Sequence, residues 1–114
     1  MTVAVIGVGR MGGPIASNLL AAGHEVRVFD LSADAVSALV DRGATAAGSP
    51  ADAARGAGVV CVVVFDDAQA REVIGGHDGV LATLETGAIV AVHTTVAIDT
   101  IRELAEVAQD CGVA

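Results

Sequence analysis

The sequence predicts a doubly wound α/β fold, in which helices cover both faces of a parallel sheet. Apolar strand-like segments alternate with segments of helical periodicity along all 114 residues, the order that crossover connections between parallel strands require. The expected strands at 3–6 and 59–65 are apolar at every position, as in strands buried on both faces. Hydrophobic residues make up 54% of the chain and aromatic residues only 2%, so Val, Ala, Leu and Ile must fill the core.

Length, charge and cysteine content narrow the class of protein. A chain of 114 residues fits one domain, and its net charge of −8 argues against binding to nucleic acid or to an anionic membrane. The longest apolar stretch, 59–65, is far shorter than a membrane span, and no signal peptide precedes the first expected strand. Cys61 and Cys111 are expected to be free thiols, so we expect a cytoplasmic protein.

The order of the elements follows from periodicity and from helix caps. Ser32 and the Ser49-Pro50 pair are typical helix starts, and Gly43 ends the helix that carries Val36, Leu39 and Val40. Strands are expected at 3–6, 25–30, 44–47, 59–65 and 88–92, and helices at about 11–22, 32–43, 50–55, 66–74, 80–84 and 98–110. In the last helix we expect four inward-facing residues: Ile101, Leu104, Ala105 and Ala108. Val113-Ala114 reads as the opening of an incomplete sixth strand.

The first strand ends in a Gly-x-Gly-x-x-Gly turn, the form of a Rossmann dinucleotide site. Gly7 permits the tight turn, Gly9 lets a pyrophosphate approach the backbone, and Gly12 lets the helix pack closely on the strand. Backbone N–H groups at the helix start attract phosphates, and Arg10 can add a donor. A glycine-rich turn without a ligand is the alternative. The turn residues expected at the cofactor are Gly7, Val8, Gly9, Arg10, Met11 and Gly12.

Asp30 makes a dinucleotide the favoured ligand. It closes the second strand 21 residues after Gly9, near the spacing of about 20 expected for the acid that binds the adenosine ribose. A carboxylate there accepts hydrogen bonds from the ribose hydroxyls and repels a 2′-phosphate, so NAD is favoured over NADP. Leu31 follows, where an Arg would have favoured NADP. A solvated acid at a strand end is the alternative.

The segment from Gly7 to Leu19, with Met11 and Asn18, followed by Gly23-His24-Glu25-Val26, closely resembles the N-terminus of the β-hydroxyacid dehydrogenases. This family includes 3-hydroxyisobutyrate dehydrogenase and tartronate semialdehyde reductase. The resemblance covers the whole chain but only the first part of a family member. It implies an NAD-binding domain of a dehydrogenase that transfers a hydride between the cofactor and a small 3-hydroxy acid or its semialdehyde.

The resemblance also implies cofactor contacts beyond the glycine turn. The backbone at Val64 and Phe65 should lie along the cofactor, Gln69 should follow as a polar contact, and Thr95 should approach the nicotinamide. The sequence departs from the family at Phe65, where Pro is usual, at Val92-His93, and at Ile98, again in place of Pro. His93 is a candidate general base beside the cofactor, although a locally hydrogen-bonded strand-end histidine is the favoured interpretation.

Family members continue into a sixth strand that binds substrate and into an all-helical domain that supplies a catalytic lysine. None of that follows here, and the chain contains no lysine. We therefore expect the fragment to bind NAD without turning over a hydroxy acid, and to self-associate through its open sheet edge. Two alternatives remain open. One is a stand-alone dinucleotide-binding or redox-sensing module; the other is the cofactor domain of an imine-reductase-like enzyme.

Overall fold

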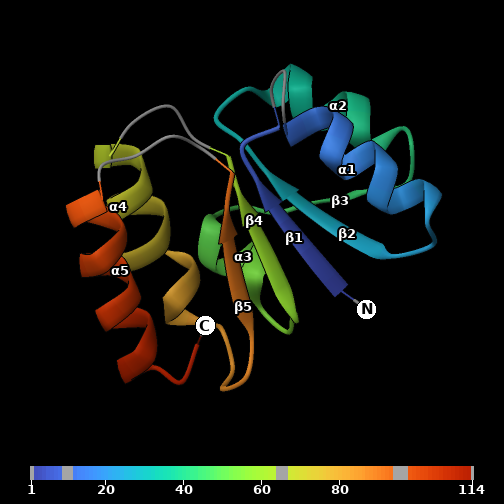
Figure 1. Ribbon diagram of the computed structural model, residues 1–114. Helices are drawn as coiled ribbons and strands as arrows, with labels where there is room; N and C mark the ends of the chain where they lie inside the picture. The colour runs from blue at the N-terminus through green and yellow to red at the C-terminus, as the bar shows by residue number, and fades with distance from the viewer. Residues whose placement is uncertain (1, 9–11, 64–66, 94–97, 114) are drawn as a thin grey trace.

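A computed structural model describes residues 2–8, 12–63, 67–93 and 98–113 of the chain, with the side chains of 98 and 99 left out. The elements are β1 (Thr2–Ile6), α1 (Gly12–Ala21), β2 (Glu25–Phe29), α2 (Ala33–Val40), β3 (Thr45–Ala46), α3 (Pro50–Ala54), β4 (Val59–Val62), α4 (Asp67–Gly75), the 3₁₀ helix η1 (Val80–Ala82), β5 (Ile89–Val92) and α5 (Ile98–Asp110). The predicted alternation of strands and helices is confirmed (Figure 1).

The five described strands form one parallel sheet in the order β3-β2-β1-β4-β5. β1 is the middle strand, with β2 on one side and β4 on the other. The chain therefore winds outward from β1 in one direction through β2 and β3, and then crosses back to build β4 and β5. Such a reversal opens a crevice at the carboxyl ends of the two strands beside it, where ligands bind in folds of this type. The predicted doubly wound sheet is confirmed.

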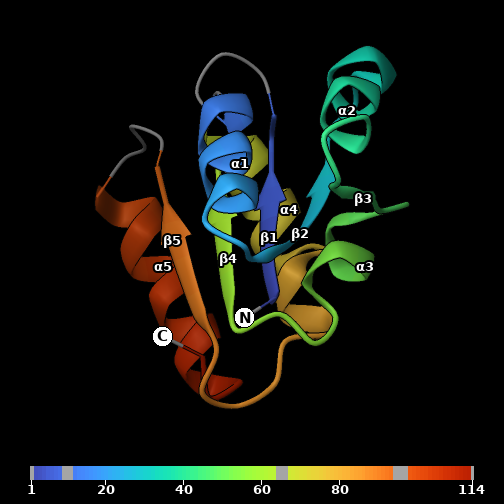
Figure 2. The ribbon, with the colours of Figure 1, turned by 90° about the vertical axis from the view of Figure 1, so that its right-hand side faces the viewer.

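Helices cover the sheet in two separate layers (Figures 1 and 2). α1 and α2 pack on one face over a core that includes Val5, Ala16 and Val28. α3, α4, η1 and α5 pack on the other face, over a core that includes Val60 and Val62. Alternate residues of β1 and β4 thus point into different cores, which explains why 3–6 and 59–62 are apolar throughout.

Three helices end in the same hydrogen-bond pattern. After α1, α2 and α5, the N–H of a glycine reaches back three residues and the next N–H reaches back five, as in the pair Gly112 N to Gln109 O (2.9 Å) and Val113 N to Ala108 O (2.9 Å). This is the Schellman motif, in which the residue after the glycine often makes a hydrophobic contact. Val113 is 2% exposed and lies in no strand. Val113 thus follows the helix cap with a buried side chain; Ala114, the other residue of the expected sixth strand, lies outside the described residues, so that expectation stays a prediction.

The inward face of α5 is narrower than the sequence predicts. Leu104 and Ala108 are buried as expected, but Ile101 is 39% exposed and Ala105 is exposed. The buried position is Thr100, whose Oγ1 accepts a hydrogen bond from Arg71 Nη2 of α4 at 3.1 Å. The buried face of α5 therefore runs through Thr100, Leu104 and Ala108, and Ile101 lies at its margin.

Arg71 of α4 makes a second bond to α5. Arg71 Nε lies 2.8 Å from Glu103 Oε2, and this hydrogen bond with its charge raises the pKa of Arg71 above its ordinary value. Both side chains are half-exposed, so the pair fixes the relative position of the helices more than it stabilises them.

Other boundaries differ by small amounts. The third strand has two residues instead of four, and Val40, expected on the inner face of α2, is 41% exposed because the helix ends there. The expected caps at Ser32 and Ser49 are present: their hydroxyls accept from Ala35 N (3.3 Å) and Asp52 N (3.0 Å). None of the described helices is long and apolar enough to cross a membrane.

Candidate functional site

The glycine turn leaves β1 at Gly7, a position where no residue with a Cβ fits. Its φ angle is +91°, and a Cβ built there would lie 1.8 Å from Val63 O of the chain leaving β4. The N–H of Gly7 donates to Phe29 O at 2.8 Å, which extends the pairing of β1 with β2 by one residue. The turn is therefore held between β2 and β4 at the point where the winding of the sheet reverses.

Gly12 begins α1 in direct contact with the same turn. A Cβ on Gly12 would lie 1.6 Å from Gly7 O and 2.7 Å from Gly7 C. Only a hydrogen atom fits between the first turn of α1 and the end of β1. This close approach directs the N-terminus of α1, with its unpaired N–H groups, toward the carboxyl edge of the sheet.

The carboxylate of Asp30 joins two backbone segments at this edge. Its Oδ2 accepts a hydrogen bond from Val8 N at 2.7 Å, within the glycine turn, and its Oδ1 accepts one from Ser32 N at 2.8 Å. The second bond places the N-cap of α2, and the first connects β2 to the turn after β1. Asp30 is half-buried and held by these two bonds, and its contact with a ribose stays a prediction.

A pocket of about 650 Å³ opens beside the turn, between the carboxyl ends of β1, β2 and β4 and the two helices α3 and α4. That volume lies within the range of small-molecule sites. Asp30 and the 90%-exposed Leu31 form one rim, and α4 forms the opposite wall. The lining residues are Ile6, Gly7, Phe29, Asp30, Leu31, Gly48, Ser49, Pro50, Val63, Ala68, Gln69, Glu72, Val73 and Asp78.

The structure brings together several residues that the sequence singled out. Gly7, Asp30 and Gln69 line the pocket, and Val8 and Gly12 adjoin it through the contacts above. The remaining predicted contacts lie outside the described residues: Gly9, Arg10, Met11, Val64, Phe65 and Thr95.

Sequence reasoning missed the floor and the far wall of the pocket. Ser49 was identified as a helix cap but not as pocket lining, and Glu72 and Asp78 were not singled out. Asp78 is held near α3 because its carbonyl oxygen accepts from Ala51 N at 2.8 Å. No local pattern reveals such a contact between segments 27 residues apart.

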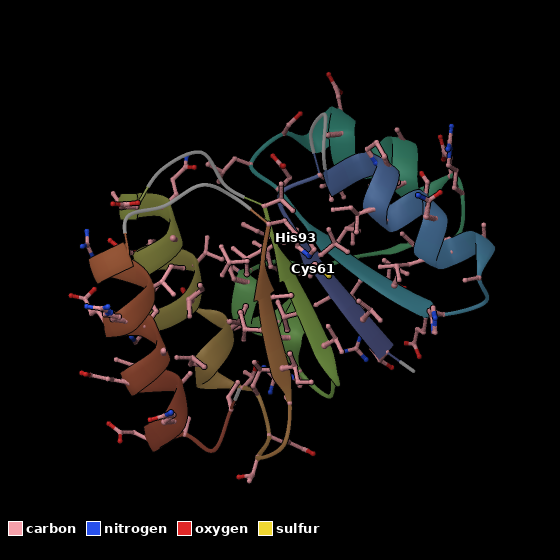
Figure 3. The ribbon with its side chains drawn as sticks, in the orientation of Figure 1. Cys61 and His93 are labelled. Carbon is pink, nitrogen blue, oxygen red and sulfur yellow. The ribbon has the colours of Figure 1, made fainter. Side chains whose placement is uncertain are left out.

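Cys61 and His93 offer no second site (Figure 3). Cys61 is buried in the middle of β4, and burial raises the pKa of its thiol, which disfavours the reactive thiolate. His93 is exposed just after β5, and its backbone N–H donates to Val62 O at 2.9 Å. No group of three potential metal ligands occurs among the described residues.

Comparison with known proteins agrees with this geometry. A family model for the NAD binding domain of 6-phosphogluconate dehydrogenase matches residues 2–114. The chain is 46% identical over 94 residues to 3-sulfolactaldehyde reductase from Escherichia coli, covering 82% of this chain and 32% of the reductase. The chain thus spans about a third of that relative's length.

Two solved structures show the likeness in three dimensions. The crystal structure of 3-hydroxyisobutyrate dehydrogenase from Salmonella typhimurium matches with a TM-score of 0.92 and 29% identity, over 99% of this chain and 39% of that one. An imine reductase from Myxococcus stipitatus in complex with NADP⁺ matches with a TM-score of 0.88 and 25% identity, over 99% and 38%. With its glycine turn, its switch-point pocket and a family match over nearly its whole length, this chain belongs to the family of the NAD-binding domain of 6-phosphogluconate dehydrogenase.

Proposed function

We propose that this chain holds NAD(H) for a dehydrogenase that moves a hydride between the nicotinamide and a small 3-hydroxy acid or its semialdehyde. One observation carries the cofactor part: the glycine turn and the Asp30 carboxylate border a pocket of about 650 Å³ at the switch point of the sheet. The substrate class is supported by the sulfolactaldehyde reductase and 3-hydroxyisobutyrate dehydrogenase relatives. An imine-reductase-like role is the alternative, favoured by the structural likeness to that enzyme.

We propose NAD in preference to NADP. Each oxygen of the Asp30 carboxylate accepts one backbone N–H and keeps a further lone pair for a ribose hydroxyl. The same pocket is lined by two more acids, Glu72 and Asp78, and by no basic residue among those described. A 2′-phosphate would meet no counter-charge among the described lining residues, whereas the two hydroxyls of NAD would donate hydrogen bonds.

Calorimetric titration with NADH and NADPH tests the preference. We expect the chain to bind NADH at least about tenfold more tightly, which corresponds to one charge-assisted hydrogen bond of about 1.5 kcal/mol. Asp30→Ala should weaken NADH binding and narrow the difference between the two cofactors. Asp34→Asn, which removes the same charge from the exposed first turn of α2, should preserve the preference. Equal affinity of the unsubstituted chain for both cofactors would contradict the assignment.

The chemistry of the whole enzyme is proposed to need more than these residues. The cofactor supplies the hydride, and the residues of this chain bind and orient it through the glycine turn and the pocket. The resemblance assigns proton transfer to a lysine, and the 114 residues include none. We therefore propose that this chain binds the dinucleotide without turnover. Its cysteines are free in the structure, which agrees with the proposed cytoplasmic location.

We further propose that the chain self-associates through β5, with no role for nucleic acid or membrane. β5 is an edge strand of the described sheet, and Ile89 on it is 48% exposed. Light scattering over a concentration series should show a monomer–dimer equilibrium, and Ile89→Lys should weaken it by about tenfold, since edge lysines block strand pairing. Val40→Lys, at a 41%-exposed position on α2, is the matched control. A single monomeric mass at every concentration would contradict this proposal.

A further inference from the structure

The Asp30 carboxylate bonds to the protein's own backbone as well as lying where a ribose is proposed to bind. Both of its carboxylate oxygens accept backbone hydrogen bonds from the protein itself, from Val8 N at 2.7 Å and from Ser32 N at 2.8 Å. The neighbouring bond from Gly7 N to Phe29 O, at 2.8 Å, runs between the same two segments. The end of β2 therefore holds the first arm of the glycine turn through two successive N–H groups, one bonded to a carbonyl and one to this side chain.

We infer that Asp30 is a positioning residue, which fixes the glycine turn in the shape that receives a pyrophosphate, in addition to its proposed contact with the ribose. This inference rests on the proposed function, because it concerns how the same site holds its ligand. A loss of NAD binding alone would not tell whether Asp30 binds the ribose hydroxyls or shapes the turn, so the two roles need separate measurements.

The burial of Val8 makes this bond important to the turn. Val8 is 4% exposed, so water does not readily replace the carboxylate as partner of its N–H. A buried N–H that loses its acceptor is strongly unfavourable, and the backbone shifts to find another partner. Any shift at Val8 also acts on Gly7, whose φ of +91° and close contact with Val63 O leave little freedom.

The first helical residue transmits the same constraint to α1. Gly12 approaches Gly7 O so closely that a single added carbon would lie 1.6 Å from it. A movement of the backbone at Gly7 and Val8 therefore either opens this contact or moves the N-terminus of α1 as well. Since the N–H groups at that terminus are the proposed phosphate donors, their orientation depends on the Asp30 carboxylate.

The two roles are compatible in one side chain. A carboxylate has about four acceptor positions, and the two backbone bonds occupy one on each oxygen. The free positions remain available to the 2′- and 3′-hydroxyls of the adenosine ribose. Asparagine at this position would keep one carbonyl oxygen, enough for either Val8 or Ser32 but not for both.

The test compares ADP with 2′,3′-dideoxy-ADP, which carries the same adenine and pyrophosphate but no hydroxyls for Asp30 to read. Both ligands are titrated into the unsubstituted chain, Asp30→Ala, Asp30→Asn and the charge control Asp34→Asn. We expect Asp30→Ala to weaken dideoxy-ADP binding by about fivefold, the effect of one lost backbone hydrogen bond, and ADP binding by a larger factor. Asp30→Asn should restore part of the dideoxy-ADP affinity, and Asp34→Asn should bind both ligands as the unsubstituted chain does.

A second measurement needs no ligand. Amide hydrogen exchange at Val8 should be slow in the unsubstituted chain and in Asp34→Asn, and at least about tenfold faster in Asp30→Ala. The amide of Val60, buried in β4, should stay protected in every variant and so show that the sheet is intact.

The outcomes separate the inference from the function on which it rests. The inference is overturned if Asp30→Ala binds dideoxy-ADP as tightly as the unsubstituted chain does, or if its Val8 amide exchanges equally slowly. Asp30 would then contact the ribose alone, and the proposed function would stand. If the unsubstituted chain binds neither ADP nor NADH, the proposed function is overturned and the inference with it.

Discussion

Gly12→Ala is expected to destabilise the fold by about 3 kcal/mol and to abolish measurable NADH binding. The new methyl group would lie 1.6 Å from Gly7 O, and both partners are backbone atoms that no rotamer change can move. Helix α1 must therefore separate from the end of β1, which removes the buried contact of Ala16 and moves the phosphate-binding N–H groups. Urea denaturation followed by circular dichroism and calorimetric titration with NADH would measure the two effects.

Gly75→Ala provides the control for this substitution. Gly75 is the last residue of α4, and a Cβ there would meet Leu104 Cδ2 at 3.7 Å, an ordinary van der Waals distance. Alanine should stabilise the chain there by about 0.5 kcal/mol, because it restricts the unfolded chain more than glycine does. Equal stability of Gly12→Ala and Gly75→Ala would show that the contact between Gly12 and Gly7 is not tight in solution.

Leu104→Ala is expected to cost about 3 kcal/mol of unfolding free energy. Leu104 is 7% exposed and belongs to the core beneath α4 and α5, so its truncation leaves a cavity in that core. Because this core adjoins α4, we also expect a small loss of NADH affinity. Chemical denaturation monitored by circular dichroism measures the stability.

Ile101→Ala, on the same helix, separates burial from hydrophobicity. Ile101 is 39% exposed, so its truncation should cost only about 0.5 kcal/mol, although the sequence predicts an inward position for it. A loss as large as that of Leu104→Ala would mean that α5 is rotated relative to the structure described here.

The fold could be predicted from the sequence because its signals are local and agree with one another. Strands apolar on both faces, serine caps at Ser32 and Ser49, and glycines after three helices each restrict the chain within a few residues. Their alternation then leaves a parallel, doubly wound sheet as the arrangement that buries them all. The expected bounds of α5, 98–110, agree with the structure for this reason.

Features set by contacts between distant segments could not be predicted. Val113 has a strand-like side chain, but its burial depends on the helix cap that precedes it. Ile101 has a core-like side chain, but Thr100 takes the buried position beside α4, where it contacts Arg71. The pocket wall at Asp78 likewise depends on a hydrogen bond to the start of α3.

The candidate site divides in the same way. The glycine motif and the spacing of Asp30 identify the turn and its acid, because this motif encodes its own backbone geometry. The two backbone bonds that the Asp30 carboxylate accepts are not encoded in any spacing. The contacts assigned to Val64, Phe65 and Thr95 come from the family resemblance and stay predictions.

The two helical layers have a consequence for how the molecule responds to its ligand. Each layer has its own core, and the sheet lies between the two cores. A dinucleotide held both by α1 in one layer and by the α4 wall in the other would connect the two layers. Partial opening of either layer would then release the ligand, so every increase in ligand concentration above its dissociation constant would suppress such openings. The cofactor would act in this domain as a structural member as well as a reactant.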